Sequence, residues 1–245
     1  MKEEEAEKII KAAPERMQEM LKSVYEYNSS FVLNEKLLEK ILFVTALIDR
    51  KFFVDDELAY EDIALPVGKG QTISQPSTIA RMLLLAELEE GDEVLEIGAG
   101  SGWNASLIAF LAYPGNVRSI DRVYSLVQKA QENVNKLRNN LKQKSPQDVT
   151  KLDKINFLTE NIFSKGKIWK KQYDKIIITA GIADGETEKK IEEIAKGLLK
   201  KNGLLICPYV SGPMLIYRKR EKNKIEKRET REEYVFVPLL EGVEK

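Results

Sequence analysis

The stretch VLEIGAGSG, residues 94–102, decides the fold of this 245-residue chain. It begins with an apolar run typical of a short buried strand, and glycines follow at Gly98, Gly100 and Gly102. Glycine lets the backbone pass close to a ligand, and the helix expected from Trp103 onward has free N–H groups in its first turn. A strand, a glycine turn and a helix in this order indicate a ligand site at the end of a strand in an α/β fold.

The segment after the glycines gives this motif its weight, because glycines also serve ordinary tight turns. The next expected strand, VRSID, ends at Asp121, about 20 residues beyond the last glycine. A carboxylate at that position accepts hydrogen bonds from a ribose diol in nucleotide-binding folds. The alternative interpretation of Asp121 is an N-cap for the following helix. The combined spacing favours ligand binding.

The glycine spacing differs from the dinucleotide fingerprint G-x-G-x-x-G, because the third glycine comes one residue early and the bulky Trp103 follows it. Glu96 lies two residues before the first glycine and completes the pattern E-x-G-x-G-x-G, which is typical of methyltransferases that use S-adenosylmethionine. Its charge suits the cationic methionine end of that cofactor. The alternative, a strand-end acid that faces solvent, is disfavoured by its apolar neighbours. The sequence therefore predicts S-adenosylmethionine as the cofactor.

Expected strands and helices alternate along the rest of the chain, which indicates a doubly wound, mostly parallel sheet with helices on both faces. This is the Rossmann-like α/β architecture of class I methyltransferases. The expected strands cover residues 92–98, 116–121, 154–159, 173–181, 203–209, 213–220 and 231–239, and the expected helices cover 103–113, 124–141 and 188–200. The last two strands are expected to return antiparallel at the sheet edge. The ligand is expected at the carboxyl ends of the first and fourth strands, where strand order reverses.

The N-terminal portion reads as helical. Residues 1–50 place apolar side chains at steps of three or four, with Pro14 inside the pattern as the start of a second helix or a kink in the first, and Asn34 as the cap of a further helix. The period then stops until a helix over residues 76–90, for which Pro76 suits the first turn.

These segments predict N-terminal helices and an active-site loop over residues 1–75, and a methyltransferase core over residues 76–245. We expect the two parts to pack as one compact unit. The polar run over residues 136–151 is expected to form a surface loop.

The composition excludes several classes of function. Lys plus Arg and Asp plus Glu balance at 39 each, so no net charge draws the chain to nucleic acid or to an anionic membrane. The longest uncharged apolar segments are shorter than the ~18 residues that a membrane span needs. Histidine is absent and Cys207 is the only cysteine, so we expect no metal site and no internal disulfide, and a cytoplasmic location.

Two stretches resemble the protein-L-isoaspartate O-methyltransferase family: LPVGKGQTISQPSTIARMLLLAEL at residues 65–88 and VLEIGAGSGWNASLIA at residues 94–109. That family carries a G-x-G-Q-T-I-S-x-P loop, then a helix, then an E-I-G-x-G-S-G motif. The similarity covers roughly residues 33–240. The loop from Gln71 to Pro76 is a rarer signature than any glycine motif, so the match is close.

The resemblance implies methyl transfer from S-adenosylmethionine to the free carboxylate of L-isoaspartyl residues, with damaged proteins or peptides as partners. It implies that the loop lies over donor and acceptor, with Ser74 and Thr72 as catalytic residues. Ser74 would bond the acceptor carboxylate or its neighbouring backbone. The substrate-binding residues that it implies are Gln71, Ile73 and Ser74. The donor-binding residues are Glu96, Gly98, Gly100, Gly102, Asp121, Asn161 and Thr179.

Structural alternatives exist for the loop residues. Ser74 also suits an N-cap ahead of Pro76, and both roles are compatible. Gln71 and Thr72 also suit turn chemistry between Gly70 and the following helix. The full Q-T-I-S-x-P sequence favours a functional role for all three polar residues.

Several positions depart from the family pattern. Asp121 replaces a glutamate, which keeps the charge but shortens the reach. Residues 160–162 read ENI in place of G-D-G, although Asn161 keeps an oxygen suited to the adenine amine. Residues 180–187 read AGIADGET, where the family continues A-A with a proline soon after. These departures leave two alternatives open: a methyltransferase with another acceptor, or a donor-binding protein without catalysis.

The predicted reaction suits a chain without histidine. A carboxyl of this kind has a pKa near ~4, so the acceptor is already ionised at neutral pH and needs no general base. The protein has to exclude water and align the reacting atoms, and such orientation supplies roughly 7–11 kcal/mol. Hydroxyl groups from Thr72 and Ser74 orient a carboxylate without neutralising its charge.

Overall fold

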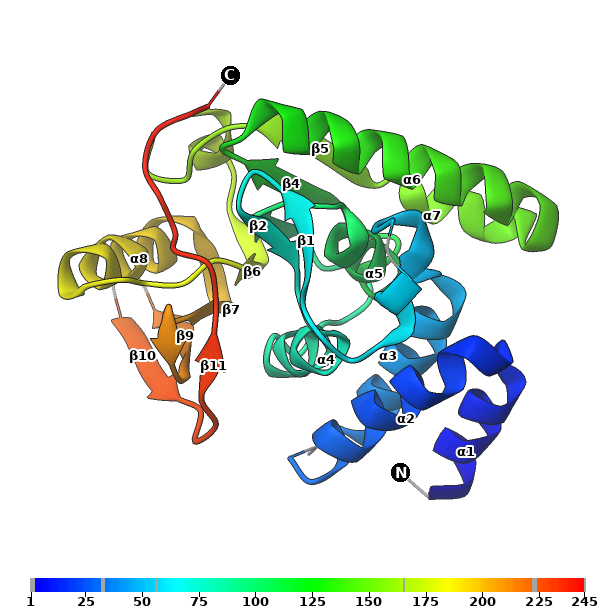
Figure 1. The fold of residues 1–245 in the computed structure, drawn as a ribbon. Coiled ribbons are helices and arrows are strands. Elements are labelled where there is room, and N and C mark those ends of the chain that lie inside the picture. Colours follow the sequence, from blue (N-terminus) through cyan, green and yellow to red (C-terminus); the bar gives the residue numbers. More distant parts are fainter. Residues whose placement is uncertain (1–2, 32–33, 56, 165, 222–223, 245) are drawn as a thin grey trace.

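A seven-stranded sheet with the order β10-β9-β7-β6-β3-β4-β5 forms the centre of the part of the chain that the structure describes (Figure 1). The computed structural model describes residues 3–31, 34–55, 57–164, 166–221 and 224–244. The strands of this sheet are Val94–Ile97 (β3), Val117–Asp121 (β4), Ile155–Thr159 (β5), Tyr173–Ile178 (β6), Leu199–Pro208 (β7), Met214–Glu221 (β9) and Lys224–Glu229 (β10).

The strand directions agree with the predicted doubly wound architecture. β3, β4, β5, β6 and β7 pair in parallel, while β9 runs antiparallel to β7 and β10 antiparallel to β9. Within this sheet, the chain passes from β3 outward to β4 and β5, and then returns to the other side of β3 through β6. Strand order therefore reverses at the carboxyl ends of β3 and β6, as predicted.

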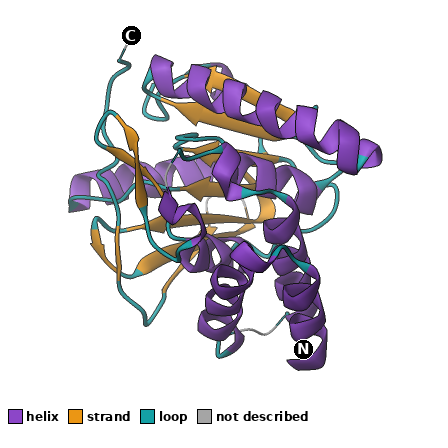
Figure 2. Cartoon of the chain, turned by 45° about the vertical axis from the view of Figure 1, so that its right-hand side comes forward, coloured by secondary structure: helices purple, strands orange, loops and turns teal. Residues whose placement is uncertain are grey.

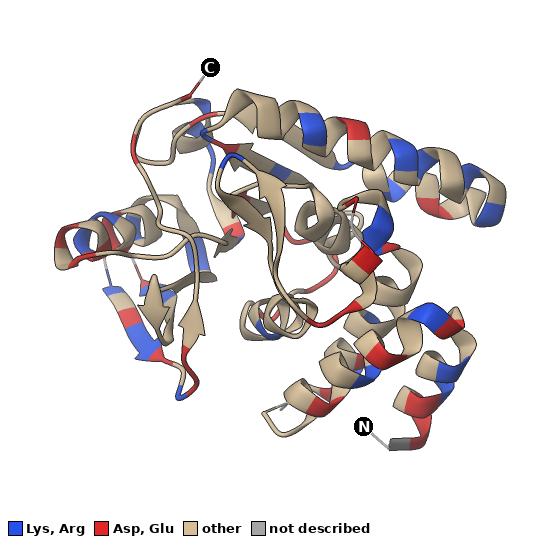
Figure 3. Cartoon of the chain, in the orientation of Figure 1, with Lys and Arg blue, Asp and Glu red and all other residues tan. Residues whose placement is uncertain are grey.

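The helices cover both faces of the sheet (Figure 2). Neighbouring strand residues point to opposite faces. Val94 and Ile177 join one hydrophobic cluster with α2 to α6, whereas Leu95 and Ile176 join a second cluster with α8. The helices are Glu3–Ala12 (α1), Glu15–Ser29 (α2), Glu35–Leu47 (α3), Pro76–Leu85 (α4), Trp103–Ala112 (α5), Tyr124–Lys144 (α6), Val149–Leu152 (α7) and Gly185–Leu198 (α8). α6 carries mostly basic residues with Glu132 among them, whereas α8 carries acidic and basic residues together (Figure 3).

The N-terminal helices begin where the sequence predicts. Pro14 directly precedes α2, and the side chain of Asn34 accepts a hydrogen bond from Leu37 N at 3.1 Å at the start of α3. The first hydrophobic cluster runs from Ala6 in α1 to Phe236 near the C-terminus, so these helices share a core with the sheet. No helix within the described residues is long and apolar enough to cross a membrane.

Two expectations about local structure are wrong. Residues 231–239 do not form an edge strand of the main sheet, because only Tyr234–Val235 (β11) is extended and it pairs with Ser211–Gly212 (β8). β10 takes the edge instead. Residues 136–151 are mostly helical, since α6 continues to Lys144 and a 3-10 turn and α7 follow.

The active-site loop also has a structure that its sequence did not predict. Leu65–Gly68 (β1) and Gln71–Ile73 (β2) pair antiparallel as a short hairpin, with Lys69 and Gly70 in left-handed backbone at its tip. We call residues 65–73 the hairpin.

Candidate active site

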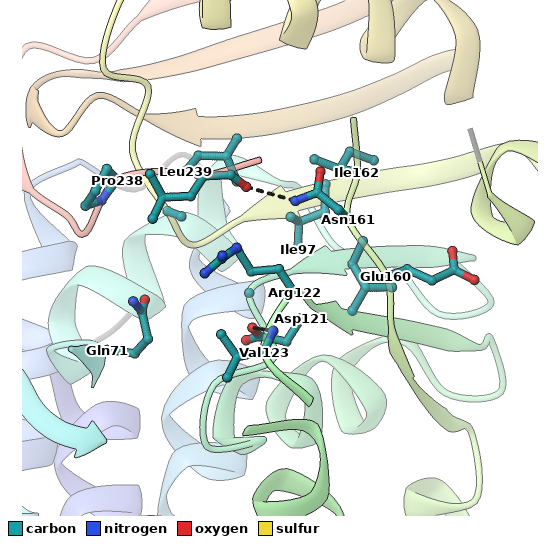
Figure 4. Close-up of a pocket in the computed structure, with 14 residues that line it drawn as sticks. Gln71, Ile97, Asp121, Arg122, Val123, Glu160, Asn161, Ile162, Pro238 and Leu239 are labelled. Carbon is teal, nitrogen blue, oxygen red and sulfur yellow. Dashed lines mark hydrogen bonds between the residues drawn. The ribbon is translucent and has the colours of Figure 1, made fainter. Parts of the chain in front are cut away.

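A first pocket lies at the carboxyl ends of β3, β4 and β6, where strand order reverses (Figure 4). About 490 Å³ of empty space, part of it open to solvent, lies within it. Its lining residues are Gln71, Ile97, Gly98, Ile120, Asp121, Arg122, Val123, Glu160, Asn161, Ile162, Ala180, Pro238, Leu239 and Leu240. Four predicted site residues, from four separate segments, are therefore brought together here.

Each of the three glycines in the motif has a different structural role. Gly98 has φ +100°, and a Cβ there would meet Thr179 Oγ1 at 2.4 Å. Gly102 precedes α5, and a Cβ there would come within 3.1 Å of Ala130 of α6, which is tighter than ordinary contact. Gly100 also has left-handed backbone, φ +50°, but a Cβ there would meet nothing closer than the Gly98 carbonyl oxygen at 4.0 Å. The space beside Gly100 is therefore free for a ligand.

Asp121 ties the end of β4 to the glycine loop. Its Oδ2 accepts a hydrogen bond from Gly100 N at 3.0 Å, and its Oδ1 accepts one from Val123 N at 3.0 Å. The N-cap interpretation of Asp121 is wrong, because Val123 is the N-cap of α6 and no side chain caps that helix. Burial raises the pKa of Asp121, while the N–H groups of Gly100 and Val123 oppose that shift. Each carboxylate oxygen keeps a lone pair for a ligand.

Glu96 lies beneath the glycine loop and does not line the first pocket. Its side chain is fully buried, accepting hydrogen bonds from Asn104 Nδ2 at 2.8 Å and from the Ser119 hydroxyl. Burial raises its pKa to about 8, although both hydrogen bonds oppose the shift. Glu96 thus joins β3 to β4 and to the first turn of α5, and the solvent-facing alternative is wrong.

Residues 237–244, which we call the C-terminal strap, close one side of the first pocket. Asn161 Nδ2 donates to the carbonyl oxygens of Leu240 at 2.9 Å and Gly242 at 3.0 Å, while Asn161 Oδ1 accepts from Phe163 N (Figure 4). The Asn161 amide, which the resemblance assigns to adenine, is therefore already hydrogen-bonded to backbone groups. Glu160, next to it, lines the same pocket.

Further bonds hold the strap across the carboxyl ends of the strands (Figure 1, red). Leu239 N donates to Gly181 O at 2.8 Å, and Glu244 N donates to Arg122 O at 2.8 Å. The Glu244 carboxylate forms an ion pair with Lys69 at the hairpin tip, 3.1 Å apart. Sequence reasoning missed this wall, since no local pattern in residues 237–244 indicates which strand ends they meet.

A second, wider pocket lies next to the first and has about 1440 Å³ of empty space. Its lining residues are Tyr27, Ala64, Thr72, Ser74, Gln75, Ser77, Thr78, Thr179, Ser211, Glu233, Tyr234, Val235, Phe236 and Val237. The two pockets share a boundary, because three pairs of consecutive residues are divided between them. The pairs are Gln71 and Thr72, Thr179 and Ala180, and Val237 and Pro238.

Thr179 secures that boundary. It lies in the lining of the second pocket, and its hydroxyl is within hydrogen-bond distance of Ile97 O at 3.2 Å and Gly98 O at 3.0 Å. The end of β6 is thereby fixed to the glycine loop. Thr179 contacts the loop from the second pocket, although the resemblance assigns it to the donor.

The hairpin residues are also divided between the two pockets. Gln71 lines the first pocket, and its Nε2 lies 3.4 Å from Lys69 O within the turn. Thr72 lines the second pocket and is exposed. Ile73 is buried in the first hydrophobic cluster and lines neither pocket. Its part in the site is to anchor the hairpin in the core.

Ser74 lines the second pocket and is not the N-cap of α4. Gln75 is the N-cap, without a side-chain bond, and the Asp62 carboxylate accepts the hydrogen bond from Ser77 N at 2.8 Å. The capping interpretation of Ser74 is therefore wrong. Asp62 satisfies an N–H group of the first turn, which leaves the Ser74 hydroxyl available to the pocket.

The second pocket is polar but carries little charge. Among the described residues of its lining, Glu233 is the only charged one, and none is a lysine or arginine. Thr72 and Ser74 each bring a hydroxyl group to this lining, whereas the Thr179 hydroxyl is already bonded to the glycine loop. A carboxylate placed there would be oriented by hydroxyl donors and would keep its charge.

The comparisons with known proteins agree on one family. The family model of protein-L-isoaspartate(D-aspartate) O-methyltransferase matches residues 17–244. Among curated relatives, the protein-L-isoaspartate O-methyltransferase of Ignicoccus hospitalis is 38% identical over 208 residues, covering 79% of this chain and 85% of its own. That of Fervidobacterium nodosum is 36% identical over 81% of this chain and 92% of its own. That of Methanopyrus kandleri is 33% identical over 96% and 95%.

A solved structure supports the fold. The chain resembles the crystal structure of a protein-L-isoaspartate O-methyltransferase homologue from Plasmodium falciparum in complex with S-adenosyl-L-homocysteine, with a TM-score of 0.72. Sequence identity is 22%, and the match covers 91% of this chain and 98% of that one. At this identity the likeness concerns the fold alone.

Proposed function

This chain belongs to the protein-L-isoaspartate(D-aspartate) O-methyltransferase family, and we propose that its two adjoining pockets divide the family's reaction between them. The enzyme transfers a methyl group from S-adenosylmethionine to the free carboxylate of L-isoaspartyl residues in damaged proteins, which initiates their repair. In our proposal the first pocket holds the donor and the second holds the acceptor. The observation that carries this division is the boundary at Gln71–Thr72, Thr179–Ala180 and Val237–Pro238.

The first pocket fits the donor by two observations. Gly98 places bare glycine-loop backbone in its lining, with free space beside nearby Gly100, and Asp121 lines the pocket with lone pairs to spare. We propose that Asp121 accepts hydrogen bonds from the ribose hydroxyls and that the glycine backbone lies against the methionine end. S-adenosylmethionine, when bound, supplies a sulfonium methyl group that is already activated for transfer.

The other predicted donor residues have supporting roles in this proposal. Glu96 braces the glycine loop through Asn104 and Ser119, and Gly98 and Gly102 permit the close packing of Thr179 and Ala130. Asn161 holds the C-terminal strap, whose Leu239 and Leu240 form an apolar wall.

In the second pocket, we propose that Ser74 and Thr72 orient the acceptor carboxylate by hydrogen bonds. The acceptor is ionised at neutral pH, so the protein has no proton to remove. A lysine or arginine would hold the oxygen more tightly but weaken its attack, and neither lines this pocket. Orientation and the exclusion of water therefore supply the catalysis, at roughly 7–11 kcal/mol.

Two further assignments are proposals of the same kind. We propose that residues 1–75 and 76–245 unfold as one unit, supported by the shared hydrophobic cluster from Ala6 to Phe236. Calorimetric unfolding in a single transition is the expected result. We also propose a cytoplasmic location, supported by the one cysteine, Cys207, which is buried and free. Cell fractionation tests that location.

The function is tested by labelled methyl transfer to a panel of acceptors. The panel contains an isoaspartyl peptide, its aspartyl counterpart and small carboxylic acids, and S-adenosylhomocysteine binding is measured alongside. Transfer confined to the isoaspartyl peptide is the expected result. Transfer to other acceptors alone would assign a different substrate, and donor binding without transfer would indicate a protein that has lost catalysis.

A further inference from the structure

Arg50 is a fully buried arginine outside both pockets, in the 3-10 turn Arg50–Phe52. Its Nη1 donates hydrogen bonds to Ala59 O at 3.0 Å and Glu61 O at 3.2 Å. A guanidinium group is planar, permanently charged and forked, so it fixes several acceptors in one geometry. These contacts organise the segment that leads into the hairpin.

The second terminal nitrogen of Arg50 joins the two ends of the hairpin. Nη2 lies 2.8 Å from Ile63 O, two residues before β1, and 3.2 Å from Ser74 O, directly after β2. A single atom thus holds both ends of the segment that carries Gln71 and Thr72. The backbone of Ser74 itself is one of the two anchor points.

The same side chain also contacts the element that follows the glycine loop. Arg50 Cζ lies 5.4 Å from the ring centroid of Trp103, the first residue of α5 directly after Gly102. The Trp103 ring is buried and donates to Ile48 O at 3.1 Å, so it holds the backbone next to Arg50 as well. Arg50 therefore bonds the residues that flank the hairpin and contacts the residue that follows the glycine loop.

From these contacts we infer that Arg50 is a positioning residue, which sets the place of the acceptor hairpin relative to the donor loop. The inference rests on the proposed division of the pockets. Methyl transfer needs the attacking oxygen in line with the sulfonium carbon, and a misplacement of about 1 Å costs roughly 100-fold in rate. Arg50 is not among the residues that line either pocket, so its effect passes through Ser74 and Trp103.

The test compares Arg50→Lys with wild-type enzyme. Lysine keeps the charge but offers a point charge on a flexible stem in place of the fork. We expect kcat on an isoaspartyl peptide to fall roughly 10- to 100-fold, with the dissociation constant of S-adenosylhomocysteine unchanged within about threefold. Amide hydrogen exchange over residues 65–75 should speed up, because the hairpin loses its common anchor.

Arg16→Lys is the matched control. Arg16 lies near the same segment, 5.2 Å from the Tyr60 ring and paired with Asp49 at 3.1 Å, but it has no contact with the hairpin stems. The Arg16→Lys enzyme should keep the wild-type kcat. Ile194→Ala, in α8 on the other face of the sheet, provides a variant with lowered stability and an intact hairpin.

The outcomes separate this inference from the proposed function. Wild-type transfer to the isoaspartyl peptide tests the function first. If that transfer is present, wild-type kcat in Arg50→Lys overturns the positioning role. The positioning role is also overturned if Ile194→Ala, at the same melting temperature as Arg50→Lys, shows the same loss of activity. It is overturned as well if Arg50→Lys loses S-adenosylhomocysteine binding to the same extent as it loses activity. Should Arg50→Lys fail to fold, Arg50→Gln gives the same comparison with a shorter, neutral donor.

Discussion

Gln71 and Thr72 are consecutive residues of β2, yet they line different pockets. Side chains alternate along a strand, so two neighbours in the hairpin point to opposite sides. The hairpin therefore forms part of the wall between the proposed site for S-adenosylmethionine and the proposed site for an isoaspartyl residue. Its position determines how the two reactants meet.

The donor site is tested by Gly100→Val and Asp121→Ala. Valine would fill the free space beside Gly100, and alanine would remove the proposed ribose partner. A hydrogen bond to a charged group contributes about 1.5–3 kcal/mol, so Asp121→Ala should weaken S-adenosylhomocysteine binding roughly 10- to 100-fold in calorimetry. The exposed Asp153→Ala is the control and should bind normally. Undiminished binding in both site variants would remove the assignment of the first pocket.

Ser74→Ala separates catalysis from capping. Since Asp62 accepts the bond from Ser77 N, removing the Ser74 hydroxyl should leave stability nearly unchanged while turnover falls roughly tenfold or more. Asp62→Ala should instead lower stability by ~1 kcal/mol, the usual cost of a lost cap. Melting curves and initial rates of both variants check this. A fully active Ser74→Ala enzyme would refute the orienting role.

Asn161→Ala tests the C-terminal strap. The variant loses both bonds to the strap carbonyls, at Leu240 and Gly242. Hydrogen exchange at the amides of Leu239 and Glu244 should speed up, and S-adenosylhomocysteine should dissociate faster. Asn135→Ala, an exposed position on α6, serves as the control. Unchanged exchange at both amides would mean that the other bonds of the C-terminal strap hold it in place without Asn161.

Stability should depend on pH through Glu96. Its pKa is about 8 in the folded protein, against an ordinary value of 4.5 that represents the unfolded chain. The folded state therefore holds a proton that the unfolded state has lost, so the contribution is fully present below pH 4.5 and is lost as pH rises through 8. From pH 6 to 8.5 the free energy of unfolding should fall by roughly 2–3 kcal/mol.

Glu96→Gln isolates this effect, because an uncharged amide replaces the protonated acid. Urea unfolding of both proteins at pH 6 and pH 8.5 gives the comparison. The variant should lose clearly less stability across this range than the wild-type enzyme. Equal losses in the two proteins would show that another group titrates.

Local sequence signals predicted the sheet, its switch point and the first pocket. The apolar strands, the glycine run and Asp121 lie close together in sequence, and Pro14 and Asn34 mark their own helix starts. The missed features depend on distant partners. Asp62 serves the first turn of α4 from 15 residues away, and Glu96 is buried because Asn104 and Ser119 can bond it. The strap meets Asn161 across 79 residues, which no local pattern encodes.

The pH dependence of the chemical step distinguishes acceptor classes. A carboxylate with a pKa near ~4 stays ionised from about pH 6 upward, so single-turnover transfer should be nearly flat from about pH 6 to 8.5. An amine or phenol acceptor would give a rate that climbs with pH, since its proton has to leave. A steep rise of the single-turnover rate with pH, measured well below the melting temperature, would rule out a carboxylate acceptor.

The most direct test of the account is a competition under single-turnover conditions. Enzyme loaded with labelled S-adenosylmethionine is mixed with two peptides that differ only in having isoaspartate or aspartate at one position. The account predicts labelled methyl ester on the isoaspartyl peptide, with wild-type enzyme far faster than Ser74→Ala, and none above background on the aspartyl peptide. Equal labelling of the two peptides, or of neither, would contradict it.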